Sequence, residues 1–289
     1  MARQPIGPGT RRGRTTQGQW TNAVLENLYK CTSRDPDELE VWCYTDRLSY
    51  APGDKVCFHI NTTAECYNLE IVRDGVTPET VHRTEGLADV MHPTPEDCSV
   101  NGCDWPVAQE FILPDDWPSG GYIVRTYVED GEESFDHRHM FILRPGSPGR
   151  NARMVLVCAT GTWIASNEWG GSNYYEGITG PGKNEFSTRL SIHRPWSRGF
   201  VWQPKGAPRI VLASPPVMGA APRYPHMEWS SATGYSMRYA SAGWASYERH
   251  FVTWAEAEGY ALDVITRNVL DRYLAPTQAT EASTLNLPE

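Results

Sequence analysis

The sequence predicts a protein of two parts, an immunoglobulin-like β-sandwich followed by a Rossmann-like or flavodoxin-like α/β domain that looks incomplete. From about residue 38 to 144, apolar and polar residues alternate, as they do in half-buried antiparallel strands. The segment at residues 144–150 has two prolines, two glycines and no apolar side chain, which is typical of a domain boundary. Beyond it, strand and helix patterns follow each other in the order of a parallel α/β layer.

Residues 1–37 are expected to form a flexible basic N-terminus with one short helix. The first 19 residues are rich in Gly, Pro, Arg, Thr and Gln, a composition typical of disorder. After them, apolar residues recur at helical spacing, at Trp20, Val24, Leu25 and Leu28.

Residues 38–146 are expected to form the sandwich. Apolar and polar residues alternate at 56–61 and again at 122–128. Pro52-Gly53 suits a type II turn, and Asp130-Gly131 suits a tight hairpin. This density of short strands and turns indicates an immunoglobulin-like sandwich.

Residues 151–276 are expected to form the α/β domain, and residues 277–289 a polar tail. The continuous apolar run Met154–Cys158 is typical of a strand buried on both faces of a parallel sheet. The next strand is expected at 260–266 and a further helix at 269–274. Between the two strands we expect a helix whose buried stripe consists of Trp244, Tyr247, Phe251 and Trp254. Its solvent side is expected to carry Glu248, Arg249, Glu256 and Glu258.

This α/β layer of two strands looks incomplete. Two parallel strands cannot cover their own faces, and they leave an edge without a partner. We therefore expect either a truncated chain, which is the favoured explanation, or an oligomer or second chain that completes the sheet.

The charge distribution disfavours nucleic acid as a partner. The net charge is −9, and residues 31–150 hold 23 acidic and 9 basic residues, which would repel a phosphate backbone. No run of 18 apolar residues occurs, and the first thirty residues lack the apolar stretch of a signal peptide. We therefore expect no membrane association and a cytoplasmic location, where the seven cysteines, Cys98 and Cys103 among them, stay reduced.

The loop expected at Thr160–Tyr175 is the predicted site, because ligands in α/β sheets bind at the carboxyl ends of the strands. Trp163 and Trp169 are its candidates for substrate binding, since their rings could stack on a ligand. Glu168 and Glu176 flank the loop, and either is a candidate general base.

Six segments in a fixed order carry a family resemblance: YTDRLSYAPGDKV (44–56), WPSGGYIVR (117–125), TGTWIASNEWGG (160–171), SIHRPW (191–196), GAPRYPHMEW with its flanking Ala (219–229) and WAEAEGYALDVIT (254–266). The sequence resembles the large (beta) subunit of N,N-dimethylformamidase and the wider family that shares its C-terminal domain. The resemblance implies a hydrolase of small formamides, in which iron held by two tyrosinates and a glutamate activates water. A hard ferric ion prefers such anionic oxygen ligands.

The candidate iron ligands are the tyrosines Tyr175, Tyr174 and Tyr239, with Tyr175 favoured. Glu176 and Asn167 are the candidate catalytic residues, and a small amide is the expected substrate. The chain departs from the family in three places. The family often has AYN where this chain has Ala165-Ser166-Asn167, and RPY where it has Arg194-Pro195-Trp196. The GHDEYW motif that carries the family glutamate is absent.

His137 and His139 point to the same side of a predicted strand, as a metal-binding pair does. On an exposed sandwich face such a pair needs a third ligand, and none is evident, so a structural role is favoured. Three functions stay open: an iron-dependent amidohydrolase, a non-catalytic family member that acts as a binding or interaction module, and a sugar-binding or surface accessory protein. The third rests on Trp163, Trp169, Tyr174 and Tyr175, whose rings could stack on a ligand ring.

Overall fold

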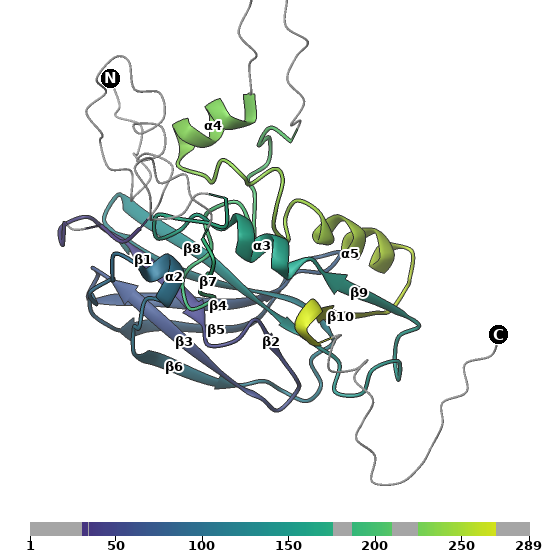
Figure 1. Ribbon diagram of the computed structural model, residues 1–289. Coiled ribbons are helices and arrows are strands. Elements are labelled where there is room, and N and C mark those ends of the chain that lie inside the picture. Colours follow the sequence, from purple (N-terminus) through teal and green to yellow (C-terminus); the bar gives the residue numbers. More distant parts are fainter. Residues whose placement is uncertain (1–30, 34, 176–186, 210–224, 270–289) are drawn as a thin grey trace, which may run out of the picture.

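The computed structural model describes residues 31–33, 35–175, 187–209 and 225–269, and it is mainly β. Two large sheets lie face to face, and the helices and a separate pair of strands lie beside them (Figure 1). The predicted N-terminal helix at 20–28, residues 270–274 of the helix predicted at 269–274 and the tail at 277–289 lie outside the described residues.

The first sheet has three antiparallel strands in the order β1-β3-β6. Their bounds are β1 (Val41–Thr45), β3 (Lys55–Thr62) and β6 (Val107–Ile112). The burial of β3 alternates over its first half, which agrees with the predicted period of two.

The second sheet has five strands in the order β2-β8-β7-β4-β5. Their bounds are β2 (Ser49–Tyr50), β4 (Cys66–Arg73), β5 (Glu79–Ala88), β7 (Gly120–Asp130) and β8 (Glu133–Leu143). The short β2 pairs with β8 in parallel, and the other pairs are antiparallel. The predicted hairpin is confirmed, because Asp130 pairs with Glu133 and Gly131 between them has a φ of 60°.

The first core lies between the two sheets. Trp42 of β1 packs edge-on against Phe135 of β8, and Tyr122 of β7 stacks on Phe141 at 5.5 Å between ring centroids. All four side chains are buried. Truncating a buried aromatic side chain of this kind typically lowers the free energy of unfolding by about 3–5 kcal/mol.

The C-terminal part contains two strands, β9 (Met154–Cys158) and β10 (Leu262–Thr266). Their predicted parallel pairing is confirmed. The expectation that the first strand is buried on both faces was wrong, because β9 is the outer strand and Val155 is 55% exposed. The more buried strand is β10, which lies nearer the sandwich.

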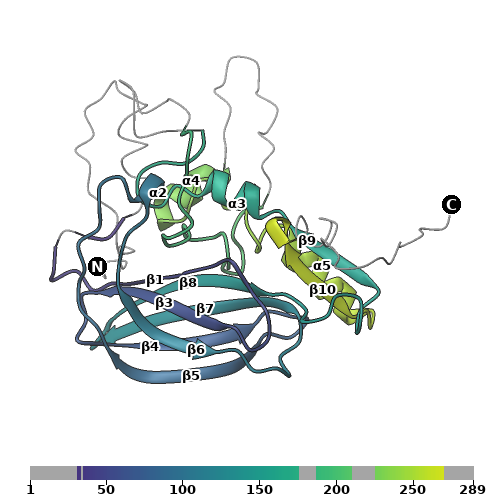
Figure 2. The same ribbon diagram turned by 60° about the horizontal axis from the view of Figure 1, so that its bottom comes forward.

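The helices are α2 (Cys98–Asn101), α3 (Thr160–Ser166), α4 (Pro225–Thr233) and α5 (Glu248–Ala257). In Figure 2, α2, α3 and α4 lie on one side of the sandwich and α5 lies beside β9 and β10, and Cys98 of α2 belongs to the first core. No helix in the described ranges has the length and apolar character that crossing a membrane requires.

A second core joins the sandwich to the C-terminal part. Ile123, Met140 and Ile142 on the outer face of β7 and β8 pack with a cluster from the C-terminal part that includes Trp244, Val252 and Leu262. Ser119, just before β7, also bonds to Val264 of β10, whose N–H donates to its hydroxyl at 2.8 Å. The part of the five-stranded sheet formed by β7 and β8 is thus covered on both faces.

The buried stripe predicted for the helix α5 was wrong, because each buried residue lies one position after the predicted one. The residues that α5 buries are Glu248, Val252 and Ala255, whereas Tyr247, Phe251 and Trp254 are 58%, 39% and 51% exposed. Successive helical residues are 100° apart, so a shift of one position exchanges neighbouring faces. Only Trp244, which precedes the helix, is buried as expected.

Candidate functional site

The predicted site lies where β9 ends. The chain turns there into α3, so the first seven residues of the stretch expected as a loop are helical. Residues 167–175 then pass over the end of the sandwich beside α2. The segment that contains His193 lies at the same end, because Cys103 N–H, just after α2, donates to the carbonyl of His193 at 2.9 Å. Since β9 and β10 are parallel, both carboxyl ends point toward this region (Figure 1).

Asn167 is buried, and its side chain joins the 167–175 segment to residues 195–197. Its amide nitrogen donates to the carbonyl of Pro195 at 3.0 Å, and its amide oxygen accepts from the N–H of Ser197 at 2.9 Å and from the Ser197 hydroxyl at 2.8 Å. The oxygen also accepts from Trp169 N–H at 3.3 Å. The side chain of Asn167, a candidate catalytic residue, is thus engaged in holding these two segments together.

Arg194 holds the 167–175 segment in place through hydrogen bonds to its backbone. Its guanidinium is buried and donates to the carbonyls of Trp169, Ser172 and Asn167, and its Nε donates to the carbonyl of Ser191. Burial lowers the pKa of Arg194 to about 10, so the group still carries its charge near neutral pH. An arginine in the middle of SIHRPW gave no sequence signal of this role.

Glu248 is the carboxylate at the end of β9 that sequence reasoning placed on the solvent side of its helix. It is buried, and its Oε1 accepts from the N–H of Ala159 at 2.9 Å and from the indole of Trp163 at 3.1 Å. Its Oε2 is buried and has no hydrogen-bond partner among the described residues. Burial raises the pKa of Glu248. The sequence offered one signal for its place in the helix, since an acidic residue is common in the first turn, but none for its burial.

Trp163 and Trp169, expected to bind substrate, lie in the two cores. The ring of Trp163 meets Trp196 and Trp244 edge-on in the second core. Trp169 is fully buried in the sandwich core, edge-on to Trp42 and near Trp105. Their placement differs from the expectation because a large indole between two sheets removes more apolar surface from water than one on a loop.

The three candidate tyrosines differ in their surroundings. Tyr174 and Tyr175 are half-exposed, their rings meet edge-on at 5.6 Å, and the guanidinium of Arg238 lies 4.7 Å from the centre of the Tyr175 ring. Tyr239 is buried, and its hydroxyl donates to the carbonyl of Pro208. Burial raises the pKa of Tyr239, which opposes the tyrosinate form. Glu176, the candidate base next to Tyr175, lies outside the described residues.

Two of the positions where the chain departs from the related sequences lie close together. Ser166 and Trp196 are both buried, and the neighbouring Asn167 bonds to the residues on either side of Trp196. The Trp196 ring stacks on Phe200 and His139 at 6.3 and 6.0 Å between centroids. An apolar ring therefore fills this position in the present chain.

His137 and His139 are buried, whereas the sequence placed them on an exposed face. Both face β1, where His137 Nδ1 accepts from Cys43 N–H and His139 Nε2 accepts from Thr45 N–H, each at 3.3 Å. They cap donors of β1 that the sheet leaves free. Burial lowers the pKa of His139 well below its ordinary value, so it is neutral at physiological pH.

The cysteines are free thiols, as expected. A hydrogen bond with Cys103 and burial raise the pKa of Cys98 to about 12, which keeps this thiol protonated. Such a thiol is a poor nucleophile and a poor metal ligand.

Together these observations define a class: a β-sandwich protein with a short parallel β/α layer packed on one of its sheets. The chain belongs to the family described as N,N-dimethylformamidase beta subunit-like, C-terminal, whose model matches residues 69–285. The match begins in β4 and runs through the C-terminal part, so it includes the buried residues of the second core and leaves out β1, β2 and β3 of the sandwich.

The other comparisons give little. No curated protein matches the sequence. Among solved structures, the sporulation control protein Spo0M from Bacillus subtilis is similar at 16% identity and a TM-score of 0.26, over 36% of this chain and 48% of that chain. The present chain thus spans about half the length of that protein.

Tyr239, Ser166 and Trp196 do not fit the iron centre implied by the resemblance. The hydroxyl of Tyr239 is held as a donor to a carbonyl, and a tyrosinate has no proton to donate. Ser166 and Trp196 stand where the family often has tyrosines. Within the described ranges, no three side chains of His, Cys, Asp or Glu gather as metal ligands would.

Proposed function

We propose that this chain is a non-hydrolytic member of its family and acts as an interaction module. The observation that carries this is the use of polar groups around the 167–175 segment. The side chains of Asn167, Arg194 and Tyr239 all form hydrogen bonds to other groups of the chain itself. Side chains so engaged hold a surface in shape and are poorly suited to activating water.

The partner surface in this proposal is the outer side of the β/α layer. Among the described residues, β9 pairs with β10 alone, and it exposes Val155. An unpaired strand edge offers free N–H and C=O groups to another strand. The exposed Phe251 and Trp254 lie on α5, which contacts β10, and the exposed Tyr247 directly precedes this helix. Exposed apolar patches commonly mark association sites.

The proposed partner is a second copy of the chain. Two β9 strands related by a two-fold axis would pair antiparallel and extend the sheet to four strands, and closed two-fold dimers are the commonest assembly. In this proposal residues 38–146 form the immunoglobulin-like part and residues 151–276 a Rossmann-like part completed by the partner. The free thiols suit a cytoplasmic location, and the acidic middle segment makes nucleic acid an unsuitable partner.

Sedimentation velocity over a range of protein concentrations tests this association. We expect a dimer whose dissociation constant rises at least tenfold in the variant Trp254→Glu, because a charge replaces an apolar contact. The matched control is Glu258→Gln, at an exposed position of the same helix end. A monomer at every concentration would overturn the proposed partner.

The second candidate function is iron-dependent hydrolysis of a small formamide, and family membership favours it. Purified protein incubated with ferric or ferrous iron should release formate from N,N-dimethylformamide if this candidate is right. Hydrolysis above the rate of heat-denatured protein with the same iron would overturn the non-hydrolytic proposal. Because the dimer assay does not depend on iron, the two tests fail independently.

A further inference from the structure

Three arginines surround one carboxylate on the outer face of the five-stranded sheet. Asp136 of β8 forms ion pairs with Arg138 at 3.0 Å, Arg125 at 3.4 Å and Arg198 at 3.9 Å. Arg125 also reaches Glu70 at 3.6 Å, and Glu70 pairs more closely with Arg83, which lies 3.9 Å from Glu85. In the described part of the chain, Arg138 and Arg198 have no other ion-pair partner, so about one positive charge stays uncompensated.

Arg138 is held in place by an aromatic ring and still has a donor to give. Its guanidinium carbon lies 3.7 Å from the centre of the Trp202 ring, a close cation–π contact. Its Nη1 is buried and has no hydrogen-bond partner among the described residues. A buried guanidinium N–H without a partner is costly, and an acceptor placed there removes that cost.

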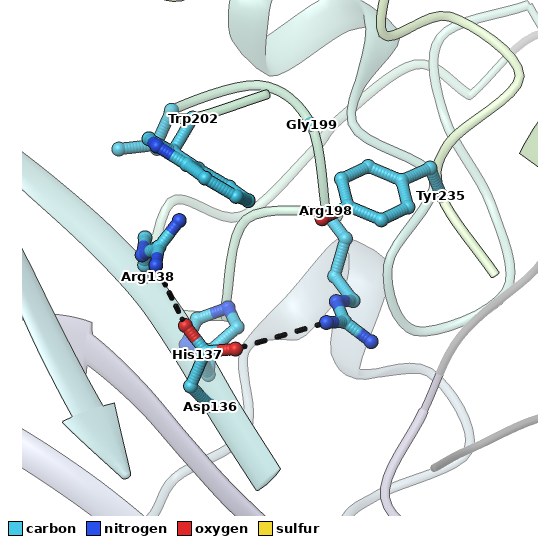
Figure 3. Close-up of a pocket in the computed structure, with 8 residues that line it drawn as sticks. Asp136, His137, Arg138, Arg198, Gly199, Trp202 and Tyr235 are labelled. Atoms are coloured by element: carbon cyan, nitrogen blue, oxygen red, sulfur yellow. Dashed lines mark ion pairs between the residues drawn. The ribbon is translucent and has the colours of Figure 1, made fainter. Parts of the chain in front are cut away.

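Asp136, Arg138 and Arg198 line a small hollow. Figure 3 shows Trp202 over Arg138 on one side, Tyr235 beside Arg198 on the other, and Asp136 between them. The enclosed part of the hollow has a volume of about 20 Å³, and the rest of its free space is open to solvent. The enclosed part has room only for a small group, such as the carboxylate end of a ligand.

We propose that this hollow binds a small monocarboxylate, with acetate as its simplest form. A carboxylate has two coplanar oxygens, which match the donors of a guanidinium. A single negative charge balances the local excess, whereas a dianion would be repelled by Asp136. The rings of Trp202 and Tyr235 suit the apolar end of such a ligand. The site is separate from the 167–175 segment and does not depend on the proposed function.

The test is an NMR titration of the full chain labelled with ¹⁵N, in a low-salt buffer free of carboxylates. The indole N–H signal of Trp202 is assigned by its loss in Trp202→Phe. We expect acetate to shift this signal to saturation, and acetamide, its uncharged isostere, to leave it in place. An equal shift with acetamide or with sodium chloride would overturn the proposal.

Variants connect the signal to the arginines. Arg138→Gln and Arg198→Gln should each weaken acetate binding at least tenfold, and the exposed Arg153→Gln should leave it unchanged. Asp136→Asn should strengthen binding severalfold, because it removes the internal competitor. This gain cannot come from misfolding, so it keeps the test decisive if an arginine variant does not fold. Unchanged affinity in all three variants of the site would contradict the proposal.

Discussion

Arg194 and the histidines of β8 show how single side chains replace missing backbone partners in this fold. Arg194 satisfies carbonyls of a segment that belongs to neither sheet, and His137 and His139 accept from N–H groups of the edge strand β1. Buried backbone groups need such partners. None of these pairs is local in sequence, which explains why a single sequence did not reveal them.

Replacing Arg194 should therefore destabilise the chain. We expect Arg194→Met to lower the free energy of unfolding by at least about 3 kcal/mol, since it leaves several buried carbonyls without donors. Urea unfolding followed by circular dichroism measures this change. The exposed Arg153→Met is the matched control and should stay within about 0.5 kcal/mol of the wild type. A small effect at Arg194 would show that the segment does not depend on this brace.

The buried His139 should make stability depend on pH. Its pKa is well below the ordinary value of 6.5, so its contribution is complete above pH 6.5 and is lost as the pH falls and the unfolded state takes up a proton. Between pH 7 and 5 this loss is at most about 2 kcal/mol, a limit set by proton uptake in the unfolded state. The variant His139→Gln should lack it, and unfolding free energies at the two pH values measure the difference.

Glu40 acts in the opposite direction and has to be separated from His139. Burial raises the pKa of Glu40 to about 7, so its contribution is complete below pH 4.5 and is lost as the pH rises through 7. The comparison of wild type with His139→Gln cancels this effect, because Glu40 is present in both. Equal pH dependence in the two proteins would show that His139 accepts a proton in the folded state.

At the scale of elements, α5 shows what periodicity can and cannot settle. The helix and its end were predictable from the spacing of its apolar residues and from Gly259. Its buried face was not, because the stripe of Tyr247, Phe251 and Trp254 is more apolar than that of Glu248, Val252 and Ala255. Glu248 can be buried because Ala159 and Trp163 donate to it, and those partners are about 90 residues away.

Paired substitutions on α5 should reveal which face is buried. Val252→Asp places a charge in the second core and should cost at least about 3 kcal/mol of the unfolding free energy, if the chain folds at all. Phe251→Asp alters the exposed face and should cost less than about 1 kcal/mol when measured on the monomer at low protein concentration. Thermal unfolding of both variants makes the comparison. The reverse order of stabilities would mean that the aromatic stripe is the buried one.

At the scale of the whole molecule, the sandwich and the C-terminal part depend on a shared core. The strand alternation and the parallel pair were predictable, since each follows from local patterns. The shared core was not, because on the outer face of β7 and β8 the apolar Ile123, Met140 and Ile142 are followed by the charged Asp136 and Arg138, which interrupt the pattern. A proline- and glycine-rich segment thus joins two parts that do not pack as separate bodies.

The full chain should therefore unfold in one transition. The fragment 31–146 should be less stable than the same segment within the chain, because the outer face of its five-stranded sheet loses its cover. Calorimetry of the chain and the fragment tests this. Two separate transitions, one of them coinciding with that of the fragment, would contradict the shared core.

The central claim is that the polar groups around the 167–175 segment maintain the structure and hold no iron. Elemental analysis of iron per folded chain, on protein grown and purified with iron and collected as a single species, tests it most directly. We predict far less than one iron per chain and no visible tyrosinate-to-iron absorption band. One iron per chain together with that band would contradict the claim and favour the iron-dependent hydrolase as the function.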